Sequence, residues 1–223
     1  MMDELLAMAE MIGDEGLRGM VLEMLEVPDV DLEGEKLPFE VCPGGAYVHH
    51  AYEGGLVQHT LAVTRLCVTL CDLVEGVYGG SVDRDTVVAG ALIHDVMKCY
   101  QYVRDGGVFR TSPLGERVDH LTLLVAELYR RGFPMEVVHV VASHHGDQSP
   151  VKPKTLEALI VSIADFADSE LSRKSLRAAE YLLREVAGGR PRLGSSGEAL
   201  ELLRVKAEEG WDGVRRLRSG KGN

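Results

Sequence analysis

The stretch that decides the fold reads Val87-Val88-Ala89-Gly90-Ala91-Leu92-Ile93-His94-Asp95. Its first seven residues are small or apolar, a pattern typical of a segment buried on nearly every side. The run then ends abruptly in an imidazole and a carboxylate. A buried carboxylate is costly unless a cation or strong hydrogen-bond donors compensate its charge. The stretch therefore predicts a core helix whose end places His94 and Asp95 at a polar centre inside the protein.

Two more ionisable residues interrupt apolar patterns in the same way. His59 begins a stripe of apolar residues at helical spacing, so its ring should point into the core. Asp165 lies inside the apolar run that starts at Leu159. A lone histidine on an apolar face is more often a satisfied core residue, so the prediction depends on the residues together. Two imidazoles and two carboxylates from three helices suit a divalent metal with open coordination positions.

Apolar residues recur at helical spacing along most of the chain, so we expect an all-α fold. The expected helices span residues 1–26, 56–74, 82–99, 117–131, 134–145, 155–171, 172–186 and 197–218. A break at Val27-Pro28-Asp29 should close the first helix, and Gly146 should end the fifth. Between Tyr100 and Thr111 the pattern predicts one short β-hairpin, which turns at Asp105-Gly106-Gly107.

Composition limits the classes of partner. The formal net charge of −11 repels long nucleic acids, and no lysine/arginine cluster offsets it, whereas a small phosphorylated substrate is attracted to a cationic centre. The acidic start and the lack of a long apolar run argue against a signal peptide and against a membrane span. The cysteines lack metal-knuckle or redox spacing, so we expect small core residues in a reducing cytoplasm: Cys42, Cys67, Cys71 and Cys99.

The order His…His-Asp…Asp resembles the HD superfamily of metal-dependent phosphohydrolases, whose fold is a helical bundle around a metal. The likeness extends to the HD domain of bacterial 3′–5′ exoribonucleases that join an OB-fold to an HD domain. The matching stretches are His49–Thr60, Leu92–Lys98, Ser143–Gly146, Ser149-Pro150, Pro153, Thr155, Glu157-Ala158 and Ala164–Asp168. The resemblance covers residues 46–171. It implies a single HD-type domain over 1–223, with an N-terminal helical extension (1–40), the HD core (46–171) and C-terminal helices (172–223).

The resemblance also implies metal ligands. The first metal would take His59, His94, Asp95 and Asp165. Three more histidines stand where the binuclear branch, such as the cyclic-dinucleotide phosphodiesterases, has extra ligands, so a second metal would take Asp95, His120, His144 and His145. From the residues alone, His144 is equally a helix C-cap and His120 a solvent-facing residue. One or two divalent ions are expected, and His/carboxylate sites accept Mn, Fe, Zn, Mg, Co or Ni.

Three departures separate the chain from those exoribonucleases. Met97 replaces a small glycine between the acidic ligand and the lysine, and the stretch after Gly146 is shorter. Residues 1–40 are helical in pattern and too short for an OB-fold barrel. We therefore expect shared chemistry without a long RNA substrate.

Residues around the expected metal site have the chemistry to bind and cleave a phosphate ester. A bound divalent ion lowers the pKa of its water to ~7, and Lys98 is placed to stabilise the developing charge. His49 and His50 precede the first ligand helix, where they would contact phosphate or, for His50, protonate a leaving group. On the hairpin, Arg104 and Arg110 are candidate substrate cations, and the aromatic residues offer stacking surfaces: Tyr100, Tyr102 and Phe109.

The leading functional hypothesis is a phosphodiesterase or phosphatase that acts on a nucleotide or short oligonucleotide through a metal-activated hydroxide, with Asp95, Lys98 and His50 as catalytic residues. Two alternatives stay open. One is an HD-type di-iron oxygenase, which would need iron and oxygen. The other is a non-catalytic, metal-dependent nucleotide sensor, which would bind nucleotides without releasing product.

Overall fold

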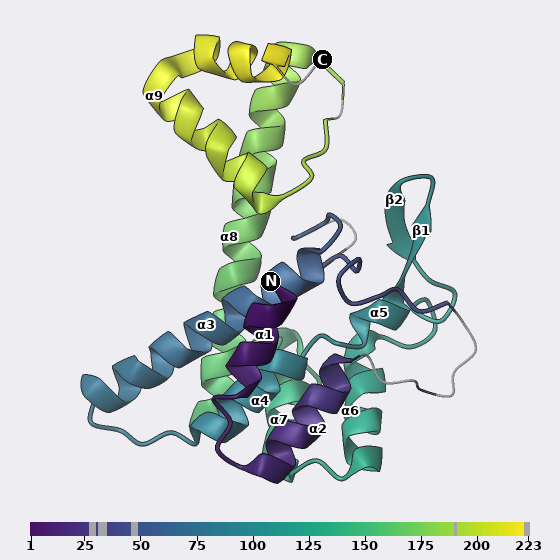
Figure 1. Cartoon of the computed structure of the whole chain (residues 1–223), viewed down its shortest axis with the longest axis vertical. Helices are drawn as coiled ribbons and strands as arrows, with labels where there is room; N and C mark the ends of the chain where they lie inside the picture. The colour runs from purple at the N-terminus through teal and green to yellow at the C-terminus, as the bar shows by residue number, and fades with distance from the viewer. Residues whose placement is uncertain (27–29, 31–34, 46–48, 190, 221–223) are drawn as a thin grey trace.

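The structure, a computed structural model, describes residues 1–26, 30, 35–45, 49–189 and 191–220. The predicted break at Val27-Pro28-Asp29 lies outside these residues. The helices are α1 (Met2–Ala9), α2 (Glu15–Leu25), α3 (Gly55–Gly76), α4 (Arg84–Ile93), α5 (Lys98–Gln101), α6 (His120–Arg131), α7 (Met135–Ser143), α8 (Leu156–Ala187) and α9 (Ser196–Gly220), with a 3-10 turn at Gly146–Gln148. The predicted all-α fold with one short hairpin is confirmed (Figure 1).

Helix α4 occupies the centre of the bundle. It packs against α1, α2, α3, α7 and α8, and every residue from Thr86 to Ile93 is buried. A Cβ added at Gly90 would lie 2.4 Å from Cγ1 of Val140 on α7, so glycine permits this close approach. The approach brings together the ends of the two helices, where the rings of His94 and His144 lie 5.0 Å apart.

The helix predicted over 82–99 is wrong in its second half, because α4 ends at Ile93. Nδ1 of His94 donates to the carbonyl oxygen of Ala91 at 2.8 Å, which engages a carbonyl near the helix end. A turn follows, in which Lys98 N–H donates to the Asp95 carbonyl oxygen. Helix α5 then begins at Lys98. The interruption lets consecutive residues, His94 and Asp95, both face the interior of the bundle.

The single helix predicted over 1–26 is also wrong. The chain breaks between α1 and α2 at Gly13-Asp14, where the Asp14 side chain accepts from Leu17 N–H as an N-cap. The backbone N–H groups of Gly13 and Asp14 donate to the Asp85 carboxylate of α4 at 2.9 and 2.8 Å. A tertiary contact therefore fixes a break that local periodicity does not reveal.

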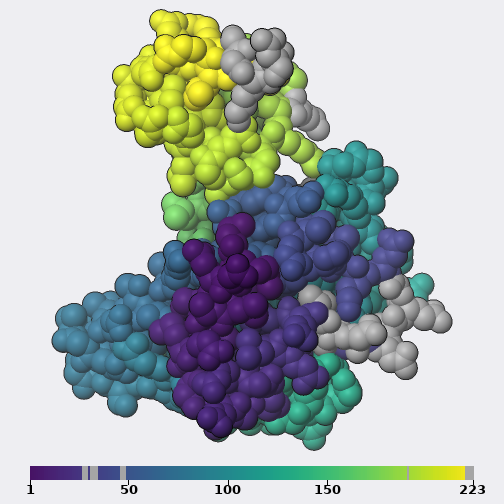
Figure 2. Space-filling view, viewed as in Figure 1, coloured from purple at the N-terminus to yellow at the C-terminus, as the bar shows by residue number. Residues whose placement is uncertain are grey.

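Helix α8 runs unbroken for 32 residues across the predicted boundary at 171/172. No glycine or proline interrupts it, and the Ser172 hydroxyl accepts from His50 N–H at 3.0 Å. Its C-terminal half leaves the bundle and pairs with α9, which is kinked at Gly210, so the two form an arm projecting beyond the bundle (Figures 1 and 2). Tyr52, from the loop before α3, is buried in the hydrophobic cluster of this arm.

The predicted hairpin is confirmed. Strands β1 (Tyr102–Asp105) and β2 (Val108–Thr111) pair antiparallel and turn at Gly106-Gly107. The aromatic residues expected to stack on a substrate face the core instead. The rings of Tyr100 and Phe109 are buried at 3% and 7% exposure, and Tyr102 packs partly buried against the hydrophobic core.

Helix α3 is long and apolar enough to cross a membrane by length and composition alone, with mean hydropathy 1.2 over its best window. The expectation that no segment is long enough was therefore too strict. The helix packs against α1, α4 and α8, and it buries His59, Thr60 and Thr64. These contacts are those of a core helix within the bundle.

Candidate metal centre

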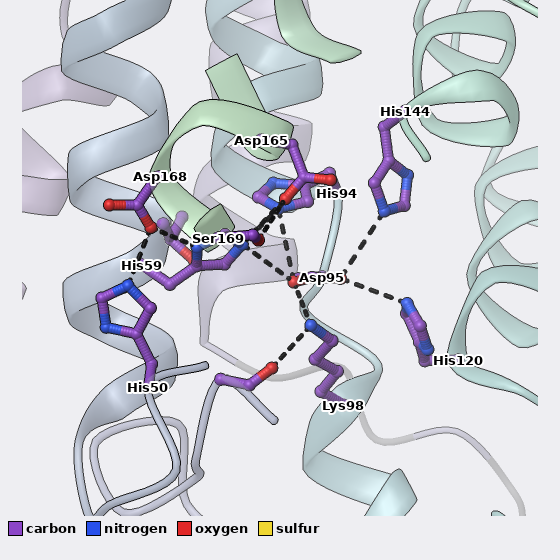
Figure 3. A network of polar contacts seen from close by, with 12 residues as sticks. His50, His59, His94, Asp95, Lys98, His120, His144, Asp165, Asp168 and Ser169 are labelled. Atoms are coloured by element: carbon purple, nitrogen blue, oxygen red, sulfur yellow. Dashed lines mark hydrogen bonds and ion pairs between the residues drawn. The ribbon is translucent and has the colours of Figure 1, made fainter. Parts of the chain in front are cut away.

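The carboxylate of Asp95 stands between two groups of side chains (Figure 3). On the first side, its Oδ2 lies 3.3 Å from Nε2 of His59 and 3.3 Å from Nε2 of His94. Oδ1 of Asp165, from α8, lies 3.2 Å from the same His59 nitrogen and 3.9 Å from that of His94. Three separate helical segments thus bring together the first predicted set of ligands.

On the second side, Asp95 Oδ1 faces three histidines. It lies 3.2 Å from Nε2 of His120 at the start of α6, and 3.7 Å from Nε2 of His144 just after α7. His145 completes the group, and the four ligand atoms all lie within 4.8 Å of one another. The structure therefore also gathers the second predicted set around the same carboxylate.

The orientation of the rings suits metal binding. Nδ1 of His94 lies 2.8 Å from the carbonyl oxygen of Ala91, and Nδ1 of His144 lies 2.7 Å from that of Val141. A carbonyl oxygen accepts hydrogen bonds only, so each Nδ1 carries a proton and each ring turns Nε2 inward. Nε2 of His94 lies 3.3 Å from Asp95 Oδ2 and Nε2 of His144 lies 3.7 Å from Asp95 Oδ1, so a cation between each pair could take both atoms as ligands.

Unpaired buried atoms support the same conclusion. Asp95 Oδ1, Nε2 of His120 and Nε2 of His144 are buried without a hydrogen-bond partner, although Oδ1 lies 3.2 Å from the His120 nitrogen. Buried polar groups are normally satisfied, and unsatisfied ones mark a missing ion or water. The donor set, imidazole nitrogens and carboxylate oxygens, fits a divalent transition metal on either side of Asp95.

The pKa values of the histidines differ between the two sides of Asp95. Burial alone lowers the pKa of His59, but the three carboxylates around it raise that pKa well above its usual value, so a metal bound here would displace a proton from Nε2. Burial lowers the pKa of His120, and it lowers the pKa of His145 to about 3. Neutral imidazole is the form that ligates metals.

Behind His59 stands a carboxylate whose role sequence reasoning missed. Nδ1 of His59 donates to Asp168 Oδ2 at 2.7 Å, which leaves Nε2 for a metal. Nε2 of His50 donates to the same oxygen at 2.8 Å, and the Tyr52 hydroxyl lies 2.7 Å from Nδ1 of His50. Asp168 lies one turn after Asp165 on the same face of α8, and that i, i+3 spacing was the signal available in the sequence.

We expect Asp168→Asn to weaken metal affinity about 10- to 100-fold, because outer partners that orient a histidine ligand raise its basicity. Calorimetric titration with Mn²⁺ or Co²⁺ measures the change, with circular dichroism as the control for folding. Metal affinity equal to that of the unchanged protein would contradict this role for Asp168.

A cleft of about 450 Å³ opens above the centre. Lys98 and His49 lie in its wall beside His144, His145 and Asp165. The Lys98 ammonium is buried between Asp95 Oδ2 (2.5 Å) and the carbonyl oxygen of Gly44 (2.6 Å). Sequence reasoning missed the remaining lining residues, which are Gln148, Phe166, Ser169, Glu170, Arg173 and Arg177.

The other predicted substrate residues lie elsewhere. His50 is 3% exposed and has both ring nitrogens engaged, so it contacts Asp168 and not the cleft. Arg104 pairs with Glu53, and Arg110 pairs with Asp105 at 2.8 Å. Neither arginine is among the described residues that line the cleft.

Comparison with known proteins adds to this geometry. The family model described as HD domain matches residues 56–169. The chain is similar to the dihydroneopterin 2′,3′-cyclic phosphate phosphodiesterase of Methanocaldococcus jannaschii, at 41% identity over 213 residues, which cover 94% of this chain and 85% of that protein.

More distant similarity links the chain to 3′–5′ exoribonucleases. The YhaM proteins of Bacillus velezensis and Listeria monocytogenes are 28% and 32% identical over 141 and 142 residues. Each match covers 58% of this chain and 43% of the exoribonuclease. No solved structure gives a significant match.

Proposed function

The chain belongs to the HD-domain family and is a metal-dependent phosphohydrolase, and from this premise we propose that it is a phosphodiesterase that opens a 2′,3′-cyclic phosphate on a small nucleoside-like molecule. The choice of a cyclic phosphate rests on the relative aligned along 94% of the chain, which is a 2′,3′-cyclic phosphate phosphodiesterase. Two divalent ions would occupy the two sides of Asp95. The candidate metals are Mn, Fe, Zn, Mg, Co and Ni.

The observation that carries the proposal is the placement of both ligand groups at one carboxylate beside a cleft. A bound divalent ion lowers the pKa of its water to about 7 and so supplies hydroxide at neutral pH. Water adds to phosphorus, one P–O bond to the ribose breaks, and the departing alkoxide takes a proton, which leaves a phosphomonoester. Two sets of ligands suit this displacement, because the attacking and the leaving oxygen both need stabilisation.

Residues of the chain complete the chemistry. Asp95 raises the pKa of Lys98 against the effect of burial, so the ammonium keeps its charge beside the site of attack. Burial, aided by Lys98, lowers the pKa of His49 to about 2, so this ring is neutral and contacts a phosphate oxygen through N–H. His50 holds Asp168, and through it His59.

The substrate is proposed to be small. The cleft of about 450 Å³ has the size of a site for one nucleotide-like molecule. The net charge of −11 disfavours the long-range attraction that binding to long RNA requires. We propose a cytoplasmic enzyme, in keeping with four buried, unbridged cysteines.

With Mn²⁺ or Fe²⁺ we expect 2′,3′-cyclic phosphates to be cleaved at least ~10-fold faster than RNA of about twenty nucleotides, with a shallow dependence on salt, because side chains would neutralise few phosphates. The measurement is the initial rate against chain length at two salt concentrations, after elemental analysis of protein purified without chelator. Rates that climb with length and collapse with salt would instead indicate an exonuclease, and nucleotide binding without turnover would indicate a sensor.

A further inference from the structure

We propose that the face of α8 beyond Asp165 is a subsite that selects a planar oxo-heterocycle, of the guanine or pterin type, attached to the phosphate. The inference rests on the proposed function and names the part of the substrate that lies away from the metal. Three lining residues of the cleft carry it: Phe166, Glu170 and Arg173.

Helix α8 extends the metal centre into a recognition surface. Asp165, Ser169, Arg173 and Arg177 follow one another at intervals of four, so they share one face of the helix. At 1.5 Å per residue, Arg173 lies about 12 Å along the axis from Asp165. A phosphate at the metal end with a bicyclic ring beyond it spans a distance of this order.

Phe166 supplies a surface for the ring. It follows Asp165 directly, lines the cleft, and is 69% exposed. A large exposed aromatic side chain beside a metal centre offers a face on which a heterocycle stacks, whatever its identity. The stacking surface expected on the hairpin is thus provided by α8.

Arg173 supplies the selective contact. Its Nε donates to Glu170 Oε1 at 2.8 Å and one terminal nitrogen donates to Oε2 at 2.6 Å, so the guanidinium is held by a fork of two hydrogen bonds. The pair is partly buried, with side chains 28% and 25% exposed. The remaining N–H groups of the guanidinium keep their capacity to donate to a ligand.

The acceptor pair that suits these donors defines the class of ring. Arginine donates in a bidentate manner to O6 and N7 of guanine, the commonest base-specific contact of this side chain. The 4-oxo group and N5 of a pterin present the same two acceptors in the same arrangement. Adenine offers an amino donor in place of the oxygen, and pyrimidines lack the fused second ring that carries the N7 acceptor, so both are poorer partners.

Arg177 provides a matched control. It lines the same cleft one turn beyond Arg173, and within the described part of the chain it has no ion pair with a carboxylate. Its side chain is exposed, and no fork of hydrogen bonds with a described carboxylate holds its guanidinium. Neutralising it changes the charge of the cleft by the same unit as neutralising Arg173, without removing the oriented guanidinium.

The test compares guanosine and adenosine 2′,3′-cyclic phosphates as substrates of metal-loaded full-length protein. We expect the unchanged protein to prefer guanosine by about 10- to 100-fold in kcat/KM, the value of one bidentate contact. Arg173→Met should bring this ratio close to one, whereas Arg177→Met should preserve it. Phe166→Leu should lower the affinity for both nucleosides about tenfold with little change in the ratio.

Binding provides a second readout, because calorimetry with guanosine and adenosine 3′-monophosphates needs no turnover. Lys174 lies 3.4 Å from Glu170, so Glu170 keeps a cationic partner in Arg173→Met and the effect on folding is limited. Arg173→Lys keeps the positive charge but cannot form the two-pronged hydrogen bond, so it tests whether the fork itself is needed. A ratio near one in the unchanged protein, or one that survives Arg173→Met, overturns the subsite and leaves cyclic phosphate hydrolysis standing. No hydrolysis with any metal refutes the proposed function, while the binding ratio still decides the subsite.

Discussion

Asp95→Asn is expected to remove most bound metal and to lower phosphohydrolase activity by about 10³-fold or more. Asp95 is the residue that both groups of ligands share, with Oδ2 facing His59 and His94 and Oδ1 facing His120. The Lewis-acid contribution of a catalytic metal amounts to several kcal/mol, and each 1.36 kcal/mol is a factor of ten in rate. Elemental analysis and the rate of cyclic phosphate hydrolysis measure the two losses.

The substitution keeps the shape of the side chain, so circular dichroism should show most of the helix content retained. It does leave the buried Lys98 ammonium without its carboxylate, and some loss of thermal stability is expected. Asp147→Asn is a matched control, because Asp147 follows closely after the histidine pair but its side chain is 88% exposed and pairs with Lys152. Full metal content and activity after Asp95→Asn would show that the centre is elsewhere.

His120→Ala is expected to remove about one of two ions and to lower activity about 10²- to 10³-fold. In a two-metal site one ion stabilises the attacking oxygen and the other the leaving oxygen, so loss of one ion removes half of this stabilisation. His120 lies only on the second side of Asp95, and its removal leaves His59, His94 and Asp165 in place. The measurement is the molar ratio of metal to protein, taken together with kcat.

His139→Ala is the matched control for this second prediction. His139 lies on α7 close to His144, but its Nε2 accepts from Lys154 N–H at the surface, away from Asp95. Its loss should change neither the metal ratio nor kcat. One ion per chain before and after His120→Ala, with activity preserved, would leave a mononuclear centre.

The sequence by itself determined the elements that depend on local pattern. Helical periodicity predicted most helices, and the Gly106-Gly107 turn predicted the hairpin, since both patterns reflect neighbours within a few residues. The side chains His59, His94, Asp95 and Asp165 stood out because ionisable groups inside apolar runs are costly to bury without compensation. Each is buried in the structure, at 8% exposure or less.

The tertiary structure alone decided where those groups meet and what surrounds them. A bond from His94 to Ala91 accompanies the end of α4 after Ile93, and the break at Gly13 is held by Asp85, more than seventy residues away. The role of Asp168 becomes visible only when α3 and α8 pack and His59 reaches it. The cleft wall of Phe166 and Arg173 was equally hidden, because an exposed residue leaves no mark on hydrophobic periodicity, and only the packing of α8 against the bundle places those side chains beside the metal centre.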